Sequence, residues 1–295
     1  MKLVRPATID DTAFISSNVP EDDAAAWTAG TYATGVEKVH NHRLYEVIAS
    51  PSTATEPGTE AGADAWLDLG ATNPWKMFDT INGSQTVGVP EIVVQVQPAG
   101  RVDSVALLNL DANYVQVIIT DAIDGTVFSE EFNLVQNDGI LDIYAYYYEP
   151  IVRKTDLIIT GITPYVAPTI QISVSNSGED TKVGTAIVGQ ARDMGATLYG
   201  ASIGIKDYSR IDVELGVYTL VPLSFSRTGS YRVRITAGFT DEFDRLMASY
   251  RAQPILYLMS DQYASTAVFG IYRNYNVEID YPTHSLASLE LEGLT

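Results

Sequence analysis

Residues 91–97 read Glu91-Ile92-Val93-Val94-Gln95-Val96-Gln97, with an apolar side chain at every second position. Successive side chains of a strand point to opposite faces, so this period of two predicts a strand with one buried face. The pattern returns in residues 114–119, Tyr114-Val115-Gln116-Val117-Ile118-Ile119. The pair Asp124-Gly125 then predicts a tight hairpin turn into a further strand over residues 126–134.

Further strand-like segments follow at a spacing of about ten residues, with turn-forming residues between them. They cover residues 143–148, 157–162, 170–174 and 183–188. No helical periodicity is visible among these segments, and many short strands at such a spacing are typical of a β-sandwich or jelly roll. The sequence therefore predicts a sandwich, which we assign to residues 66–190.

A cluster of glycines, Gly195, Gly200 and Gly204, marks the expected start of the last domain. Domain boundaries fall in such exposed, turn-rich segments, so we assign residues 191–295 to a β-rich assembly domain. Its strands are predicted over residues 218–226, 231–236, 255–259, 267–272, 275–279 and 286–291. A turn at Thr228-Gly229-Ser230 is expected to separate the first two of these strands.

One helix is predicted in this domain, over residues 240–252. Its apolar stripe consists of Phe243, Leu246, Met247 and Tyr250. The spacing i, i+3, i+4, i+7 places these side chains on one helix face. Thr240 is the expected N-cap, and Pro254 is expected to stop the helix.

Residues 1–65 are expected to form a small module. The stretch from residue 26 to residue 69, which crosses the end of this module, carries well-spaced aromatic side chains, Trp27, Tyr32, Tyr45 and Trp66. So short a region cannot bury a large apolar core, and aromatic packing would have to stabilise it. Exposed Trp and Tyr rings also stack on the C–H faces of sugars. The four residues are therefore candidates both for a core and for a glycan-binding platform.

The predicted fold class is thus mostly β. A small aromatic N-terminal module is followed by a β-sandwich or jelly roll and then by a β-rich C-terminal domain with one helix.

The charge of the 295-residue chain limits its partners, because the net charge at pH 7 is −19. Binding to nucleic acid or to an anionic membrane relies on Lys and Arg, so neither partner is expected. No apolar run approaches the roughly 20 residues that cross a bilayer, so membrane insertion is not expected either. The absence of cysteine excludes disulfides and cysteine nucleophiles and fits production in a reducing cytoplasm.

Catalytic motifs are not recognisable in the sequence. It contains no nucleophile elbow, no phosphate-binding glycine loop and no zinc-protease motif. The histidines His40 and His42 resemble a nuclease motif in their letters only, because further ligands are missing. We expect no catalytic residues, no metal and no cofactor. A third hypothesis is a glycan-degrading enzyme. Such an enzyme needs two carboxylates across a cleft, and a single sequence does not show which two these would be.

Three arginines form a local exception in this acidic chain: Arg227, Arg232 and Arg234. In a strand that starts at Tyr231, Val233 and Ile235 would face the core and Arg232 and Arg234 the other side. The arginines have two readings, a solvated strand face or an assembly interface with an acidic neighbouring copy, since Arg is enriched at interfaces.

The aromatic region resembles the small chitin-binding modules of carbohydrate-binding families 5 and 12. The resemblance rests on Trp27-Thr28-Ala29-Gly30-Thr31-Tyr32, then Gly35, Val39, Tyr45-Glu46, Pro57 and Trp66. The chain departs from those modules at Val36, where they usually carry Asp. The resemblance implies glycan binding by Trp27, Tyr32, Tyr45 and Trp66.

Other segments are similar to tail proteins of bacteriophages. The first is Trp66-Leu67-Asp68-Leu69-Gly70-Ala71-Thr72-Asn73-Pro74-Trp75-Lys76-Met77-Phe78-Asp79, which in that group leads into a discoidin-like (galactose-binding-like) jelly roll. Residues 100–110 fit the same group, as do Gly204-Ile205-Lys206-Asp207-Tyr208-Ser209-Arg210 and Leu289-Glu290-Leu291-Glu292-Gly293-Leu294.

This second resemblance implies a minor tail or baseplate component at the tail tip of a long-tailed phage. Such a virion structural protein would be made in the bacterial host cytoplasm. It would contact other tail or baseplate proteins and further copies of itself as a homo-oligomer, with a host cell-surface glycan as a candidate ligand. The alternative function is a lectin-like carbohydrate-binding protein whose main role is glycan recognition.

Overall fold

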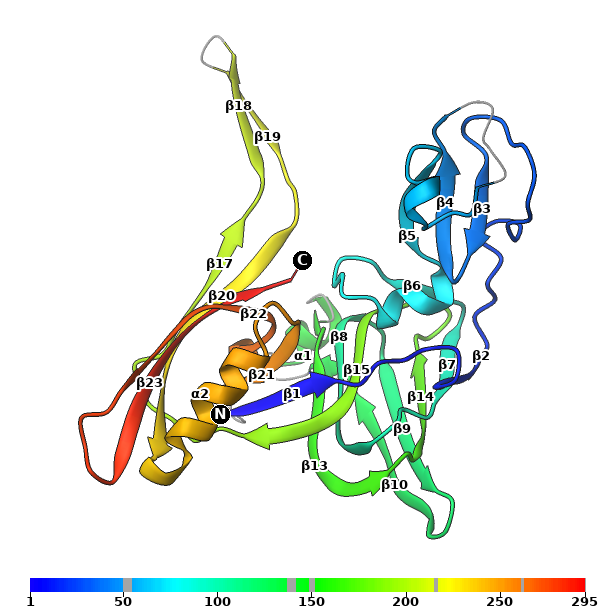
Figure 1. Cartoon of the computed structure of the whole chain (residues 1–295). Helices are drawn as coiled ribbons and strands as arrows, with labels where there is room; N and C mark the ends of the chain where they lie inside the picture. The colour runs from blue at the N-terminus through cyan, green and yellow to red at the C-terminus, as the bar shows by residue number, and fades with distance from the viewer. Residues whose placement is uncertain (50–54, 137–141, 149–151, 215–216, 261–262, 295) are drawn as a thin grey trace.

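The computed structural model describes residues 1–49, 55–136, 142–148, 152–214, 217–260 and 263–294. The chain is mostly β, with antiparallel sheets that curl around two cores and one main helix near the C-terminus (Figure 1). The predicted fold class is thereby confirmed.

The strands in chain order are β1 (Lys2–Pro6), β2 (Phe14–Ser17), β3 (Glu37–His40), β4 (Arg43–Val47), β5 (Trp66–Ala71), β6 (Thr86–Gly88), β7 (Glu91–Val96), β8 (Arg101–Asp111), β9 (Tyr114–Asp121), β10 (Gly125–Asn133), β11 (Val135–Gln136), β12 (Val152–Arg153), β13 (Leu157–Val166), β14 (Thr169–Ser175), β15 (Thr181–Asp193), β16 (Ala196–Thr197), β17 (Ser202–Asp207), β18 (Arg210–Glu214), β19 (Val217–Val221), β20 (Phe225–Thr236), β21 (Ile255–Leu258), β22 (Ala267–Glu278) and β23 (His284–Gly293). The α-helices are α1 (Ile143–Tyr148) and α2 (Thr240–Ser249). Short 3₁₀ helices cover Glu60–Gly62, Asn73–Phe78, Ala237–Phe239 and Ala264–Thr266.

An 11-stranded sheet runs through the whole body of the molecule in the order β13-β8-β15-β1-β21-β22-β23-β20-β16, with β6 beside β15 and β17 beside β20. The N-terminal strand β1 lies in its middle. Lys2 is opposite Asp193 of β15 on one side and opposite Leu258 of β21 on the other. Strands of the predicted sandwich and of the predicted assembly domain therefore belong to one hydrogen-bonded sheet.

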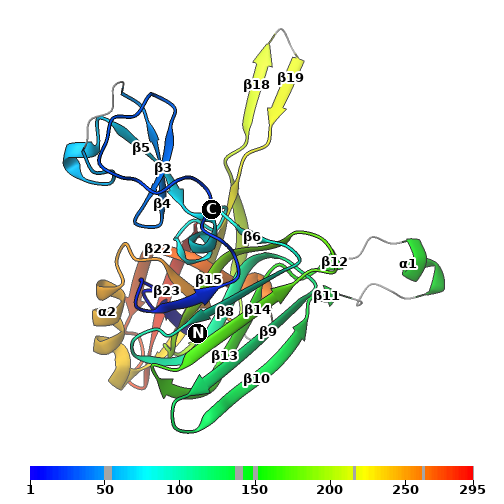
Figure 2. The same cartoon turned by 90° about the vertical axis from the view of Figure 1, so that its right-hand side faces the viewer.

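A second sheet of five strands, β10-β9-β14-β7-β2, packs on one half of the large sheet to form a β-sandwich (Figure 2). Its core side carries the alternating residues that the sequence analysis predicted to be buried, Ile92, Val94 and Val96 of β7 and Val115, Val117 and Ile119 of β9. The hairpin predicted at Asp124-Gly125 is confirmed, because Gly125 of β10 pairs with Asp121 of β9.

The second core lies between the other half of the large sheet and helix α2. Phe243 and Met247 of the predicted apolar stripe are fully buried there, and Leu246 and Tyr250 are partly buried. The helix ends at Ser249, three residues before the predicted position. Phe239 takes the N-cap position, and the Thr240 hydroxyl lies 3.0 Å from that of Ser285.

A small separate sheet, β3-β4-β5, forms a module that projects from the body (Figures 1 and 2). Its β3–β4 hairpin turns at Asn41 and His42, both in the left-handed region with φ of 48° and 62°. Trp75 joins the module to the body, because its ring stacks on His42 at 4.2 Å and on Phe14 of β2 at 4.6 Å. Asp11 and Glu21 hold the His42 ring from both nitrogens.

The structure divides the chain differently from the predicted boundaries. Residues 1–17 do not belong to the module, because β1 and β2 are strands of the two large sheets. Trp66, expected to open the sandwich, begins the last strand of the module. Residue 190 lies inside strand β15 and is no boundary. Backbone pairing between distant segments therefore determines the units of this fold.

Two predicted local features are wrong. Residues 143–148 were expected to be a strand, but they form helix α1, in which the Tyr144 and Tyr148 rings contact each other at 4.6 Å across one helical turn. The expected turn at residues 228–230 lies within strand β20, which pairs with β17 and β23. A Cβ at Gly229 would clash with the ring of Tyr231, so this glycine serves packing rather than a turn.

The central position of β1 leads to a first prediction. Leu3 is 1% exposed between the two halves of the large sheet, so Leu3→Ala should lower the free energy of unfolding by about 2–5 kcal/mol. Urea denaturation measures this change. The control Ile123→Ala, at a position that is 92% exposed, should change stability little. Equal stabilities of the two variants would contradict this role of β1.

Candidate functional site

The four aromatic residues singled out in the sequence do lie together in the small module. Tyr45 and Trp66 are 6% and 4% exposed, and Trp27 and Tyr32 are partly buried against them. Tyr32 meets Trp66 edge to face at 5.9 Å. The aromatics form the core of the module, as the first of their two readings expected.

The environment of Tyr45 and Trp66 leaves their ring faces inaccessible to a ligand. The Trp66 indole donates a hydrogen bond to the carbonyl of Thr55 at 3.0 Å. Burial raises the pKa of the Tyr45 phenol, and a Cβ at Gly58 would lie only 2.6 Å from its hydroxyl oxygen. Lys38 covers the Tyr32 ring, with its Nζ 4.9 Å from the ring centroid.

The predicted arginine cluster is split between two faces of β20. Arg232 and Arg234 are exposed on the outer face while Val233 and Ile235 are buried, as the strand period predicts. Arg227 lies on the inner face, where its guanidinium donates to the carboxylate of Asp156 at 2.9 Å. Arg227 is therefore part of an intramolecular ion pair and does not share a face of β20 with the other two arginines.

A projecting arm is the feature that the sequence analysis missed. Strands β18 and β19 form a two-stranded hairpin beyond the edge of the large sheet, and it projects on the same side as the small module (Figures 1 and 2). Residues 202–214 and 217–223, the arm, expose large apolar side chains. These are Ile203, Ile205, Tyr208, Ile211, Val213, Tyr218, Leu220 and Leu223.

The arm is anchored at its base by the carboxylate of Glu292 in β23. This carboxylate accepts hydrogen bonds from Lys206 at 2.9 Å, from the Tyr208 hydroxyl at 3.0 Å and from Arg273 at 2.6 Å. These donors, Arg273 first, lower the pKa of Glu292 to about 2. The base of the arm is thus held by charge-assisted hydrogen bonds to one carboxylate of β23, which Arg273 of β22 fixes through its other oxygen.

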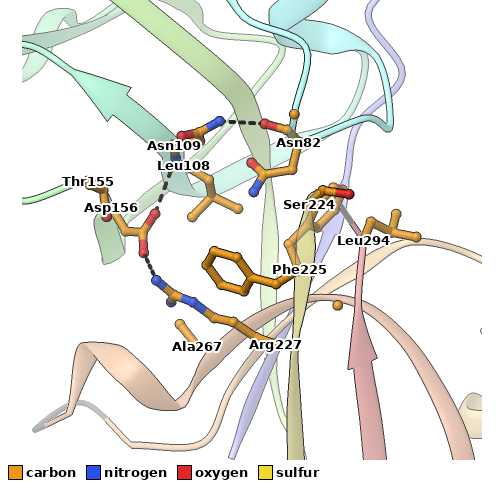
Figure 3. Close-up of a pocket in the computed structure, with 13 residues that line it drawn as sticks. Asn82, Leu108, Asn109, Thr155, Asp156, Ser224, Phe225, Arg227, Ala267 and Leu294 are labelled. Atoms are coloured by element: carbon orange, nitrogen blue, oxygen red, sulfur yellow. Dashed lines mark hydrogen bonds and ion pairs between the residues drawn. The ribbon is translucent and has the colours of Figure 1, made fainter. Parts of the chain in front are cut away.

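A cleft of ≈ 310 Å³ opens beside the Arg227–Asp156 ion pair (Figure 3). One wall carries Asn82 and Asn109, and the opposite wall carries the ring of Phe225. The Asp156 side chain is only 14% exposed, and its other oxygen accepts a hydrogen bond from the backbone of Asn109 at 3.2 Å. No residue of this cleft except Arg227 was a predicted site residue.

Within the described ranges, no three His, Asp or Glu side chains are grouped so that they could hold a metal ion. Nor does any helix of the described chain have the length and apolarity needed to cross a membrane.

Comparison with known proteins adds no family: no family model, no curated protein and no solved structure matches this chain.

The Glu292 anchor predicts a dependence of stability on pH. Because its pKa is lowered in the folded protein, the anchor stabilises fully above about pH 4.5 and is lost as pH falls toward about 2. The difference in free energy of unfolding between the wild type and Glu292→Gln should shrink over that range. Urea denaturation at a series of pH values measures it.

Glu290→Gln is the matched control, since Glu290 lies two positions away on the same strand and is exposed. Its difference from the wild type should show no such decline between these pH values. A Glu292→Gln difference that stays constant with pH would contradict the anchor.

Proposed function

We propose that this protein is a structural component of a bacteriophage tail tip or baseplate, which acts through contacts with other protein chains and performs no catalysis. The observation that carries the proposal is the apolar arm. Its two strands face solvent on both sides, and isolated two-stranded hairpins are only marginally stable in water. A partner surface would bury the exposed residues and stabilise the hairpin.

The size of the apolar surface on the arm matches a protein interface. A half-exposed large apolar side chain presents roughly 100 Å², so the eight side chains of the arm present on the order of 800 Å², close to the about 800 Å² per partner of a standard interface. Monomers rarely expose more than a few hundred Å² of contiguous apolar surface.

The arm also has an ordered apolar face. Ile211 pairs with Leu220 and Val213 with Tyr218, so these four side chains share one side of the hairpin. Aromatic and aliphatic side chains on a firmly anchored ribbon are the type of residues that fill the centre of interfaces. The Glu292 anchor holds the base in place, which limits the entropy lost on docking.

A second contact is offered by Arg232 and Arg234. Neither has an ion-pair partner among the described residues, although the chain carries a net charge of −19. An acidic surface of a neighbouring subunit would complement them. The partners of the proposal are other tail or baseplate proteins and further copies of this chain, and the location is the tail tip of the virion.

The tail assignment itself is supported by the sequence segments that resemble phage tail proteins. The lectin alternative is weakened at the aromatic module, because Tyr45 and Trp66 are core residues there.

We predict that charges on the arm strongly reduce incorporation into particles. Tyr218 and Leu220 are 70% and 69% exposed, so Tyr218→Lys with Leu220→Lys should leave folding intact. Because burying a lysine without a partner is costly, the contact should weaken by at least about 1.4 kcal/mol, and incorporation should fall at least about tenfold. Immunoblots of purified particles from complemented cells measure it.

The control is Ile123→Lys, which places a charge at a turn outside the arm, where Ile123 is 92% exposed. It should incorporate like the wild type. An arm variant that incorporates normally would exclude the arm as the assembly contact.

Immunogold electron microscopy of particles from an induced lysate of the source strain tests the location. An antibody to this chain should place gold at the tail tip. Particles without gold, with the antigen free in solution, would overturn the tail proposal.

A further inference from the structure

The cleft beside Arg227 and Asp156 is built from segments that are far apart in the sequence. It is lined by the loop at Asn82, the end of β8, the residues before β13, the start of β20 and the chain end at Leu294. Figure 3 shows the side chains of these segments turned toward one space between the two halves of the body.

The polar wall of the cleft is held rigidly. The Asn109 amide donates to the carbonyl of Asn82 at 2.7 Å, and Gln85 donates to the carbonyl of Asn109 at 2.9 Å. Behind them, a Cβ at Gly184 would lie 2.7 Å from the Cβ of Asn109 and 2.9 Å from the Asn82 carbonyl oxygen. Glycine at this position therefore permits the close approach of loop and strand that places both amides at the cleft.

The hydrogen-bonding groups of the cleft retain unused capacity. The Asn82 side chain accepts from Thr185 at 3.3 Å through its oxygen, and its NH₂ group points into the cleft in Figure 3. The Arg227 guanidinium has five N–H donors, and the carboxylate of Asp156 accepts from only some of them. Donors and acceptors thus lie together, as recognition of hydroxyl groups requires, because each hydroxyl both donates and accepts.

The opposite wall is apolar. The Phe225 ring is 55% exposed at the edge of the cleft, with Leu108, Phe269 and Leu294 around it. An aromatic plane that faces planar polar side chains suits a ligand with one C–H face and a rim of hydroxyls.

The charge and the volume of the cleft restrict the chemical class of the ligand further. Arg227 and Asp156 neutralise each other, and the net charge of −19 disfavours an anion. The volume of ≈ 310 Å³ stands at the lower end of ligand pockets, about 300–1,000 Å³, which leaves room for one or two sugar rings. We propose that this cleft binds a neutral sugar residue, with Phe225 stacking on its C–H face and Asn82, Asp156 and Arg227 bonding its hydroxyls.

This site goes beyond the proposed structural role and lies outside the aromatic module. If no sugar bound to the cleft, the assembly proposal would still stand, because the cleft is tested by sugar binding and the arm by incorporation into particles.

The test is saturation-transfer NMR on the full chain with methyl glycosides of glucose, galactose, mannose and N-acetylglucosamine, each at up to about 50 mM, the weak end of measurable affinities. At least one glycoside should bind in the millimolar range. Phe225→Ala should weaken that binding at least about tenfold, which corresponds to about 1.4 kcal/mol. Asn82→Ala should also weaken it.

Two variants outside the cleft serve as controls for Phe225→Ala and Asn82→Ala. Tyr199→Ala removes an aromatic ring that is 99% exposed elsewhere, and Trp27→Ala alters the aromatic module. Both should bind like the wild type. Absence of binding to all four glycosides, binding that survives Phe225→Ala, or loss of binding only in Trp27→Ala would each overturn the proposal.

Discussion

Backbone hydrogen bonds along both edges of strand β1 hold the two halves of the body together. The β1 backbone lies between β15 and β21 and closes a gap that would otherwise leave two sheet edges unpaired. Unpaired edges are exposed to aggregation, so this pairing protects the body as well as joining its halves. Five residues at the start of the chain thereby convert two β units into one sheet of 11 strands.

That connection also sets the position of the candidate sites. Because β20 belongs to the same sheet as the sandwich strands, Arg227 reaches Asp156 and the cleft forms between them. The same start of β20 pairs with β17, which leads into the arm, and Glu292 anchors the arm there. Phe225 of the cleft therefore lies next to the base of the arm, where its side chain is exposed.

The small module, the arm and the cleft differ in what their side chains can bind. The small module stacks on the body through Trp75 and uses its own aromatics as a core. The arm presents apolar side chains that only a protein partner of matching surface would bury. The cleft combines amides, an ion pair and two aromatic rings, a composition that suits a small polar ligand.

Local features with a clear period could be predicted from the sequence alone. The alternation of β7 and β9, the hairpin at Asp124-Gly125, the stripe of α2 and the exposure of Arg232 and Arg234 all followed from side-chain geometry along one element. The sequence also identified the four aromatics of the module without deciding whether they were core or platform. The pairings over long distances followed only from the three-dimensional arrangement: β1 in the large sheet, Arg227 opposite Asp156 and the walls of the cleft. Periodicity reports the two faces of one segment, whereas the partner of a strand edge or of a charged side chain comes from a segment up to hundreds of residues away.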